Sequence, residues 1–203
     1  MRIDDEALLQ RLPPPPAAWD RTTQRLAAVL APVFERNGED WLLFVVRRDD
    51  LRSHAGQVAF PGGGAEPGEG PRETMLREVE EELGMPAAGV RVLAGLPSRT
   101  SSSGFRVHAF VGRIPDPAQL RPDSREIARL LALPWSLLAE ASRWEHRRPA
   151  PGPDGRQHPE SPHFPHAGEL VWGLTGRICW DLRCLLAGES TPARLDGSPH
   201  GEA

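Results

Sequence analysis

An acidic segment that directly follows a run of glycines is the feature that most constrains the fold of this chain. Pro71 suits the first turn of a helix and Gly84 suits the position after the last turn, so the sequence predicts a helix over residues 71–83. Residues 60–64 read Phe-Pro-Gly-Gly-Gly, a tight turn that lets other groups approach its backbone closely. The chain must therefore place a helix directly after a glycine-rich turn.

The predicted helix carries acids and apolar side chains on adjacent faces. At about 3.6 residues per turn, Glu78, Glu81 and Glu82 share one face. The neighbouring arc can be buried against a sheet and consists of Met75, Leu76, Val79 and Leu83. Like charges at this spacing destabilise a helix by about 0.2–0.5 kcal/mol. A solvated face tolerates that cost, whereas Mg²⁺ would bind such carboxylates, and the helix alone leaves both interpretations open.

Composition excludes several other kinds of phosphate chemistry. All 24 basic residues are arginine, and the sequence contains no lysine and no tyrosine. A P-loop, a protein kinase site and a Schiff-base enzyme each require a lysine. Any phosphate or carboxylate group must therefore be bound by arginine, by backbone amides or by a metal ion.

One pattern of spacing extends across the turn and the helix. Gly63 is followed after five residues by Glu69, after seven more by Arg77-Glu78-Val79, and then, each after one residue, by Glu81-Glu82 and Gly84-Met85. This pattern resembles the signature of the Nudix hydrolases at every fixed position. The resemblance implies an α/β fold, an α/β/α sandwich around a mixed β-sheet. It also implies hydrolysis of a diphosphate bonded to another group, with Mg²⁺ or Mn²⁺ as cofactor.

The resemblance assigns metal ligands by position. Glu78 and Glu82 would bind the metal and Glu81 would share that work. A backbone carbonyl near the start of the signature would add a ligand, and here that is the carbonyl of Gly62. Glu78 is alternatively the base that deprotonates water.

Arg77 is expected to hold the acidic face in place. The resemblance implies that it orients Glu78 or its neighbours, whereas Glu69 would tie the loop to the helix. Helix geometry places Glu81 one turn after Arg77 and Glu73 one turn before it. We therefore expect Arg77 to pair with both.

The residues before the signature narrow the substrate. They resemble the extra motif of the coenzyme A pyrophosphatase branch of the Nudix hydrolases, and departures stand at Phe44, Val45 and Arg48. Later segments, Ser102–Val107 and Val171–Thr175, resemble that branch as well. The implied reaction cleaves coenzyme A or its thioesters into 3′,5′-ADP and (acyl-)4′-phosphopantetheine. The substrate-binding residues implied by this resemblance are Arg47, Arg52, His54, Gln57, Phe60 and Gly63.

The arginines beside the predicted helix have two interpretations. Arginine binds phosphates with two parallel hydrogen bonds, and coenzyme A carries a 3′-phosphate besides its diphosphate. The alternative is pairing with Asp49, Asp50 or surface acids. We favour substrate binding for Arg52 and simple pairing for Arg48.

Other polar and aromatic residues carry weaker signals. Glu126 is predicted as a further catalytic carboxylate, acting as base or metal ligand, with a surface acid as the alternative. His158, His163 and His166 fit no zinc spacing. The tryptophans are expected in the core, with Trp172 as the exception, and Ser101–Ser103 are expected to form a loop.

Periodicity predicts a mixed sheet with helices packed on it. Strands are expected at 26–34, 41–46, 90–96, 105–114, 127–133 and 170–172, and helices at 4–12, 134–141 and 174–186. Residues 47–70 are expected to form a long loop. We divide the chain into an N-terminal extension (1–23), a Nudix domain (24–187) with an exposed Pro-rich loop or lid (147–168), and a disordered tail (188–203).

Charge and cysteine usage bear on partners and location. The net charge of −4 gives no general attraction to nucleic acid or anionic lipid, and no apolar run has the length of a membrane span. Cys179 and Cys184 would lie on different helix faces, which disfavours a disulfide and fits a reducing cytoplasm. We expect a small-molecule substrate and either a monomer or a homodimer.

Two alternative functions stay open at this point. One is hydrolysis of a different nucleoside diphosphate derivative, such as ADP-ribose, NADH or a dinucleoside polyphosphate. The other is a non-catalytic nucleotide-binding regulator.

Overall fold

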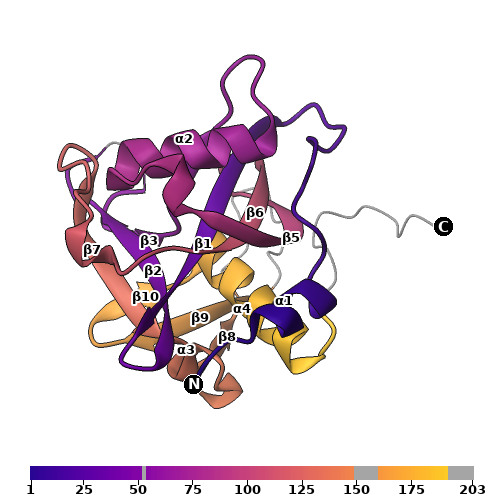
Figure 1. The fold of residues 1–203 in the computed structure, drawn as a ribbon, viewed down its shortest axis with the longest axis vertical. Coiled ribbons are helices and arrows are strands. Elements are labelled where there is room, and N and C mark those ends of the chain that lie inside the picture. The colour runs from indigo at the N-terminus through magenta and orange to yellow at the C-terminus, as the bar shows by residue number, and fades with distance from the viewer. Residues whose placement is uncertain (52–53, 149–159, 192–203) are drawn as a thin grey trace.

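A mixed seven-stranded sheet forms the centre of the structure (Figure 1). The computed structural model describes residues 1–51, 54–148 and 160–191. The strands of this sheet are β1 (Arg25–Arg36), β2 (Glu39–Arg47), β3 (Val58–Ala59), β4 (Gly62–Gly64), β5 (Arg91–Thr100), β6 (Phe105–Arg113) and β7 (Ile127–Pro134). Five follow the order β3-β2-β1-β6-β5, while β4 pairs with β1 and β7 pairs with β2. Strands β1 and β6 run parallel, and the other pairs are antiparallel.

Helices cover both faces of this sheet (Figure 1). On one face, α2 (Pro71–Leu83) contributes Met75, Val79 and Leu83 to an apolar core. On the other, α1 (Asp5–Arg11) and α4 (Gly173–Ala187) enclose a second core. A small sheet of β8 (Glu145–Arg147), β9 (Ser161–His166) and β10 (Glu169–Val171) adjoins α4, and α3 (Trp135–Leu138) follows β7. Single 3₁₀ turns lie at Ala87–Gly89, Pro117–Gln119 and Ala141–Arg143. The predicted α/β/α sandwich with a mixed sheet is confirmed.

The first hairpin forms for a local reason. Strands β1 and β2 are joined by Asn37 and Gly38, which both have positive φ angles, 54° and 76°. Two such residues form the tight turn whose twist matches that of paired strands, and Asn-Gly is its preferred sequence. The predicted hairpin is confirmed.

Helix α2 has the bounds that the sequence predicts. Pro71 occupies its first position, and Gly84 ends it in the left-handed conformation at φ 65°. The amide of Gly84 donates to the carbonyl of Glu80 at 2.9 Å. Local residues therefore set both ends of the helix that carries the glutamates.

The expectation of a loop throughout residues 47–70 is wrong in part. Strand β4 consists of three glycines, which individually disfavour strands. It forms because its backbone lies unusually close to β1: a Cβ atom on Gly62 would lie 2.3 Å from the carbonyl oxygen of Ala28. Only glycine permits that approach, so tertiary pairing makes a strand of a sequence that predicts a turn.

The expectation of an exposed loop or lid at 147–168 is also wrong in part, because residues 161–166 form strand β9. Strand β9 is mostly buried, and Phe164 has 1% exposure. Pro162 pairs with β8 and Pro165 with β10, so each half of β9 has a neighbour on one side. That arrangement leaves a free edge at each proline, where a strand tolerates the missing N–H. Residues 149–159, including His158, lie outside the described residues.

Both ends of the described chain contact helices. Ile3 and Leu8 belong to the core beneath α1. The amide of Glu189 donates to the carbonyl of Cys184 at 2.8 Å, and its carboxylate pairs with Arg183. The prediction of a disordered tail from residue 188 is therefore wrong for residues 188–191, and residues 192–203 lie outside the description.

Two further observations concern the helices. Cys179 and Cys184 of α4 are buried free thiols. In the described part of the chain, no helix combines the length and apolar character needed to cross a membrane.

Candidate active site on the acidic helix

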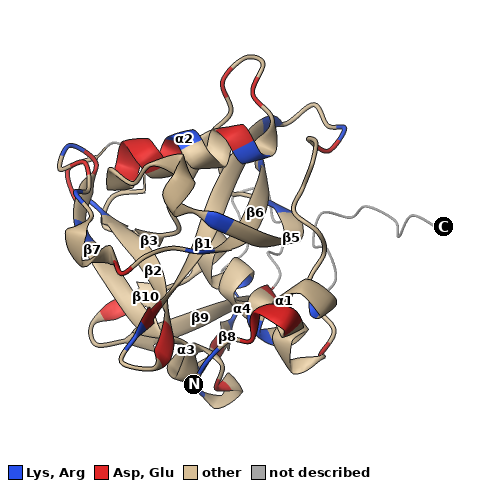
Figure 2. Cartoon of the chain, viewed as in Figure 1, with Lys and Arg blue, Asp and Glu red and all other residues tan. Residues whose placement is uncertain are grey.

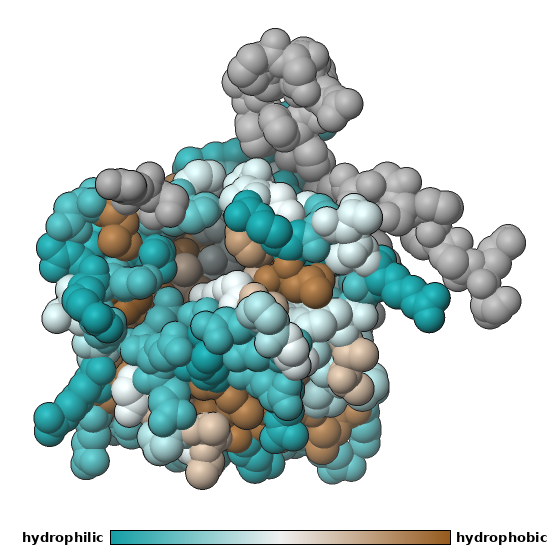
Figure 3. All heavy atoms as spheres, turned by 90° about the horizontal axis from the view of Figure 1, so that it is seen from above, coloured by the Kyte–Doolittle hydropathy of each residue, from teal (hydrophilic) through white to brown (hydrophobic). Residues whose placement is uncertain are grey.

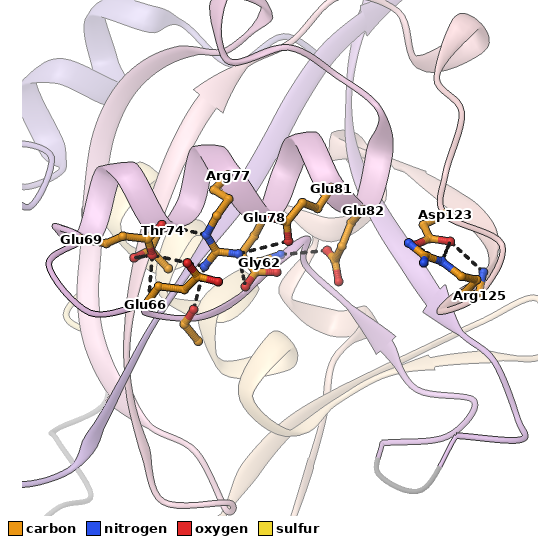
Figure 4. Close-up of polar contacts among 11 residues, drawn as sticks. Gly62, Glu66, Glu69, Thr74, Arg77, Glu78, Glu81, Glu82, Asp123 and Arg125 are labelled. Atoms are coloured by element: carbon orange, nitrogen blue, oxygen red, sulfur yellow. Dashed lines mark hydrogen bonds and ion pairs between the residues drawn. The ribbon is translucent and has the colours of Figure 1, made fainter.

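The glutamates of α2 face the glycine strand β4 (Figure 4). The amide of Gly62 donates to Oε2 of Glu82 at 3.0 Å. Gly62 has a φ of 142°, a backbone conformation that residues other than glycine rarely adopt. A Cβ atom on Gly63 would lie 2.5 Å from the carboxylate of Glu78. The two glycines therefore bring backbone directly against two of the three glutamates predicted as metal ligands.

Arg77 holds the other side of the acidic face. Its guanidinium donates to Glu69 at 2.7 Å, to Glu78 at 3.0 Å and to Glu81 at 3.1 Å. It also donates to the carbonyl of Gly64 at 2.9 Å. Figure 2 shows the resulting alternation of acidic and basic residues along α2. One arginine thus links the loop, β4 and two of the glutamates.

The predicted ion pair between Arg77 and Glu81 is confirmed, and the one with Glu73 is wrong. Glu73 turns back to accept a hydrogen bond from the amide of Gly70 at 2.7 Å. That amide lies at the start of α2, where helix N–H groups lack partners within the helix. Glu69 takes the place of Glu73, and it also accepts from the hydroxyl of Thr74 at 2.9 Å. The hydrogen bond from Arg77 lowers the pKa of Glu69 to about 2.

Burial disfavours the ionised form of two of the glutamates. Burial raises the pKa of Glu82 to about 7, opposed by the hydrogen bond from Gly62 and reinforced by the charge of Glu78. Burial likewise raises the pKa of Glu78, opposed by Arg77 and reinforced by Glu81 and Glu126. The site therefore concentrates negative charge in partly dry surroundings, which costs free energy unless a cation is present.

The residues present fit a hard divalent cation. Glu78, Glu81, Glu82 and a backbone carbonyl at Gly62 form an all-oxygen donor set, which suits Mg²⁺ or Mn²⁺. Over the described ranges, no three acidic, histidine or cysteine side chains are already gathered around a common ion position. The acids are held instead by Arg77 and by the Gly62 amide. A cation would offset the burial, and the repulsion from nearby carboxylates, that raise the pKa values of Glu78 and Glu82.

Arg47 and Glu126 lie beside the same acids. Arg47 is 3.7 Å from Oε1 of Glu82 and 3.2 Å from Oε2 of Glu126. The backbone of Glu126 is fixed because its carbonyl accepts from the amide of Arg48 at 2.9 Å. The structure therefore brings both predicted residues to the site, where Arg47 contacts carboxylates. The roles of Arg47 in substrate binding and of Glu126 in catalysis stay predictions.

The predictions for Arg48 and Arg52 have different outcomes. Arg48 pairs with Asp50 through two hydrogen bonds of 2.8 and 2.7 Å, as the sequence favours. Arg52 lies outside the described residues, so its predicted contact with substrate stays a prediction.

A cleft of about 340 Å³ opens beside the glycine strand. Six of the predicted substrate-binding or metal-binding residues line it together, although they span strands and loops. These are Arg47, His54, Gln57, Phe60 and the pair Gly62-Gly63. Nδ1 of His54 and Oε1 of Gln57 are 3.0 Å apart, and Phe60 is fixed by stacking on Phe44 at 4.8 Å between ring centroids.

The opposite wall of the cleft comes from segments far along the chain. Ser101–Ser103 and Phe105 contribute from the turn between β5 and β6, and Trp172–Thr175 from the start of α4. Sequence reasoning gave these residues no role, because their nearness to Gly63 depends on the fold. The similarity of both segments to the coenzyme A branch was the one available signal.

Trp172 lies at the surface of the cleft and stacks on the buried His163. Trp172 is 42% exposed and lines the cleft. His163 is buried, lies 2.9 Å from the carbonyl oxygen of Ser161 through Nδ1 and stacks on Trp172 with ring centroids 6.0 Å apart. The expectation that Trp172 is the exception among the tryptophans agrees with this exposure.

The surface seen in Figure 3 is mainly hydrophilic, with hydrophobic side chains in separate patches. The described helices and strands thus enclose their apolar residues on both faces of the sheet.

Comparisons with known proteins identify the family. The model of the NUDIX domain matches residues 24–153. The uncharacterized Nudix hydrolase NudL of Yersinia enterocolitica is 39% identical over 170 residues, which cover 81% of this chain and 83% of that protein. NudL of Yersinia pestis is also 39% identical, over 161 residues that cover 77% of each chain.

Solved structures of low sequence identity also match part of the chain. The Nudix hydrolase RenU of M. smegmatis has a TM-score of 0.49 at 21% identity, covering 57% of this chain and 74% of that one. The Ap4A hydrolase of C. elegans has a TM-score of 0.46 at 17% identity, covering 52% and 77%. With the family model and the NudL relatives as the evidence, the chain belongs to the Nudix family and is a pyrophosphohydrolase of nucleoside diphosphate derivatives.

Proposed function

We propose that this Nudix hydrolase cleaves the diphosphate of coenzyme A or its thioesters, releasing 3′,5′-ADP and (acyl-)4′-phosphopantetheine. The observation that carries the proposal is the composition of the cleft. It joins His54, Gln57 and Phe60 of the upstream motif to Trp172–Thr175 of the C-terminal one, beside Gly62-Gly63. Both motifs resemble the coenzyme A branch, and one substrate in this cleft would contact both.

The chain's own residues suit hydrolysis of a diphosphate. Nudix hydrolases in general need divalent metal ions, and when bound such an ion activates water and neutralises phosphate charge. Glu78, Glu81, Glu82 and the carbonyl of Gly62 would hold it. Arg77 fixes the position of Glu78, which limits the rearrangement needed for reaction.

The base that accepts the proton of water is one of the glutamates near the cleft. Burial raises the pKa of Glu78, and a base works best when its pKa lies near the working pH. Glu81 and Glu126 are the alternatives, since both lie near enough to raise the pKa of Glu78. Arg47, which lies 3.7 Å from Glu82, would bind phosphate of the substrate.

Identification of the products tests the proposal. The purified chain is incubated with Mg²⁺ or Mn²⁺ and, separately, coenzyme A, acetyl coenzyme A, ADP-ribose, NADH and a dinucleoside polyphosphate. We expect 3′,5′-ADP from both coenzyme A substrates. Turnover of the other diphosphates with none of coenzyme A would contradict the substrate, and absence of metal-dependent turnover across the panel would support a nucleotide-binding regulator instead.

A further inference from the structure

Arg177 of α4 carries its positive charge in half-buried surroundings. Its Nε atom is buried and has no hydrogen-bond partner among the described residues. In the part of the chain that the structure describes, its guanidinium forms no ion pair either. Burial, followed by the nearby charge of Arg99, lowers the pKa of Arg177. A half-buried arginine in this condition costs free energy unless an anion joins it.

The nearest carboxylate is committed to another arginine. Asp181 lies one turn after Arg177 and has 1% exposure. It accepts two hydrogen bonds from Arg99, one of them 2.8 Å long from Nε. This paired geometry satisfies Asp181, so its hydrogen bonds go to Arg99 and not to Arg177.

Arg177 lies next to the cleft wall. Gly173 and Leu174, one turn earlier on α4, line the cleft, and so do Thr175 and Ile178. Side chains in a helix lean toward its N-terminus, over the preceding turn. This lean directs the side chain of Arg177 toward the turn that forms this wall.

The arginines at the diphosphate end of the cleft are Arg77 and Arg47, and both are already paired with carboxylates. Arg77 is occupied by Glu69, Glu78 and Glu81, and Arg47 by Glu82 and Glu126. Both lie at the carboxylate helix, where the scissile bond must be. A separate anionic group of the substrate, farther along the cleft, would be left for Arg177.

We propose that Arg177 binds a phosphate monoester of the substrate, apart from the diphosphate, and so selects substrates that carry one. The inference rests on the proposed function, since the 3′-phosphate of coenzyme A is the group of this class. Arginine suits the role because its fixed fork matches phosphate oxygens and keeps its charge when buried.

The matched pair of coenzyme A and dephospho-coenzyme A tests this directly, because they differ by the 3′-phosphate alone. For the unmodified enzyme we expect kcat/KM to be at least about tenfold higher for coenzyme A, mainly through KM. In Arg177→Met that ratio should fall to near one. Arg143→Met removes the same charge from an exposed ion pair with Glu140 outside the cleft lining, and should keep the ratio of the unmodified enzyme.

A second measurement needs no variant. Calorimetric titration of the unmodified enzyme with 3′,5′-ADP and with AMP should show the tighter binding for 3′,5′-ADP, again by about tenfold. Equal affinities, or an Arg177→Met enzyme that keeps the full preference, would overturn the role of Arg177 while coenzyme A turnover still stood. Loss of all coenzyme A turnover in the unmodified enzyme would instead overturn the proposed function, and this inference with it.

Discussion

Two neighbouring glycines of β4 meet different surroundings, and the difference can be tested. A Cβ atom on Gly63 would lie 2.5 Å from the Glu78 carboxylate, whereas one on Gly64 would meet its nearest atom, in the ring of Phe105, at 3.6 Å. Gly63→Ala should displace Glu78 and lower kcat by about 10- to 100-fold, because small misplacements of catalytic groups are costly. Kinetics on a diphosphate substrate, together with the melting temperature, measure the effect.

Gly64→Ala serves as the matched control for this substitution. It introduces the same methyl group one residue later, at ordinary contact distance. We expect its kcat within about twofold of the unmodified enzyme. Equal kcat values for the two variants would show that the closeness of Gly63 to Glu78 has no catalytic consequence.

The raised pKa of Glu82 predicts a pH dependence of stability in the metal-free protein. Between its ordinary value of 4.5 and about 7, the folded state keeps a proton that the unfolded state has lost. The contribution of Glu82 to stability is therefore fully present below pH 4.5 and is lost as the pH rises through about 7, by roughly 1–3 kcal/mol. Urea unfolding at about pH 5 and about pH 8 with a chelator present measures this loss.

Glu82→Gln separates this effect from other titrations. The amide cannot ionise, so the variant should lose less stability across the same pH window and should have no hydrolytic activity. Some slope should remain, because burial also raises the pKa of Glu78. If the variant and the unmodified protein lost stability in parallel, Glu82 would not be the group that titrates.

At the scale of elements, one ion pair joins the loop before α2 to the helix itself. Glu69 accepts from Arg77, from Thr74 and from the amide of Glu66. Glu69→Gln should lower the free energy of unfolding by about 1–3 kcal/mol, as expected for hydrogen bonds to a charged group. Hydrogen exchange should also become faster in residues 64–70.

The control for this element is Glu66→Gln in the same loop. The backbone amide of Glu66 contacts Glu69, and its exposed side chain can change without affecting that contact. We expect a change in unfolding free energy within about 0.5 kcal/mol. Similar losses in both variants would indicate a general effect of loop charge rather than the bond to Arg77.

The elements also show where sequence reasoning succeeds. Helix α2 and the first hairpin are predictable because their ends are set by neighbouring residues, Pro71 and Gly84 in one case and Asn37-Gly38 in the other. Strands β4 and β9 are not, since glycine and proline disfavour strands locally. They form only because β1, β8 and β10 supply partners.

At the scale of the whole molecule, the N-terminal segment closes one face of the fold. Leu8 of α1 is fully buried, whereas the adjacent Leu9 is 61% exposed. Leu8→Ala should lower the free energy of unfolding by about 2–5 kcal/mol, as for other buried leucines. Leu9→Ala should change it by less than about 0.5 kcal/mol, and denaturant unfolding of both variants measures the difference.

A small effect of Leu8→Ala, equal to that of Leu9→Ala, would mean that the segment contributes little to the folded state. Other contacts argue that it contributes substantially. Asp40, which is fully buried, accepts from the amide of Ile3 and from Arg113. Arg113 of β6 compensates its charge, and the docked N-terminal segment adds the hydrogen bond from Ile3.

The sequence by itself determined the family, the acidic helix and the candidate metal ligands. These depend on spacing within one turn and one helix, where local geometry places Glu78, Glu81 and Glu82 together. The tertiary structure decided which of the acids have raised pKa values and which residues line the cleft. Burial of Glu82, the contact of Arg47 with Glu126 and the presence of Gln57 and Trp172 in one cleft all depend on residues far apart in the chain. Packing brings these residues together, and local spacing does not encode it.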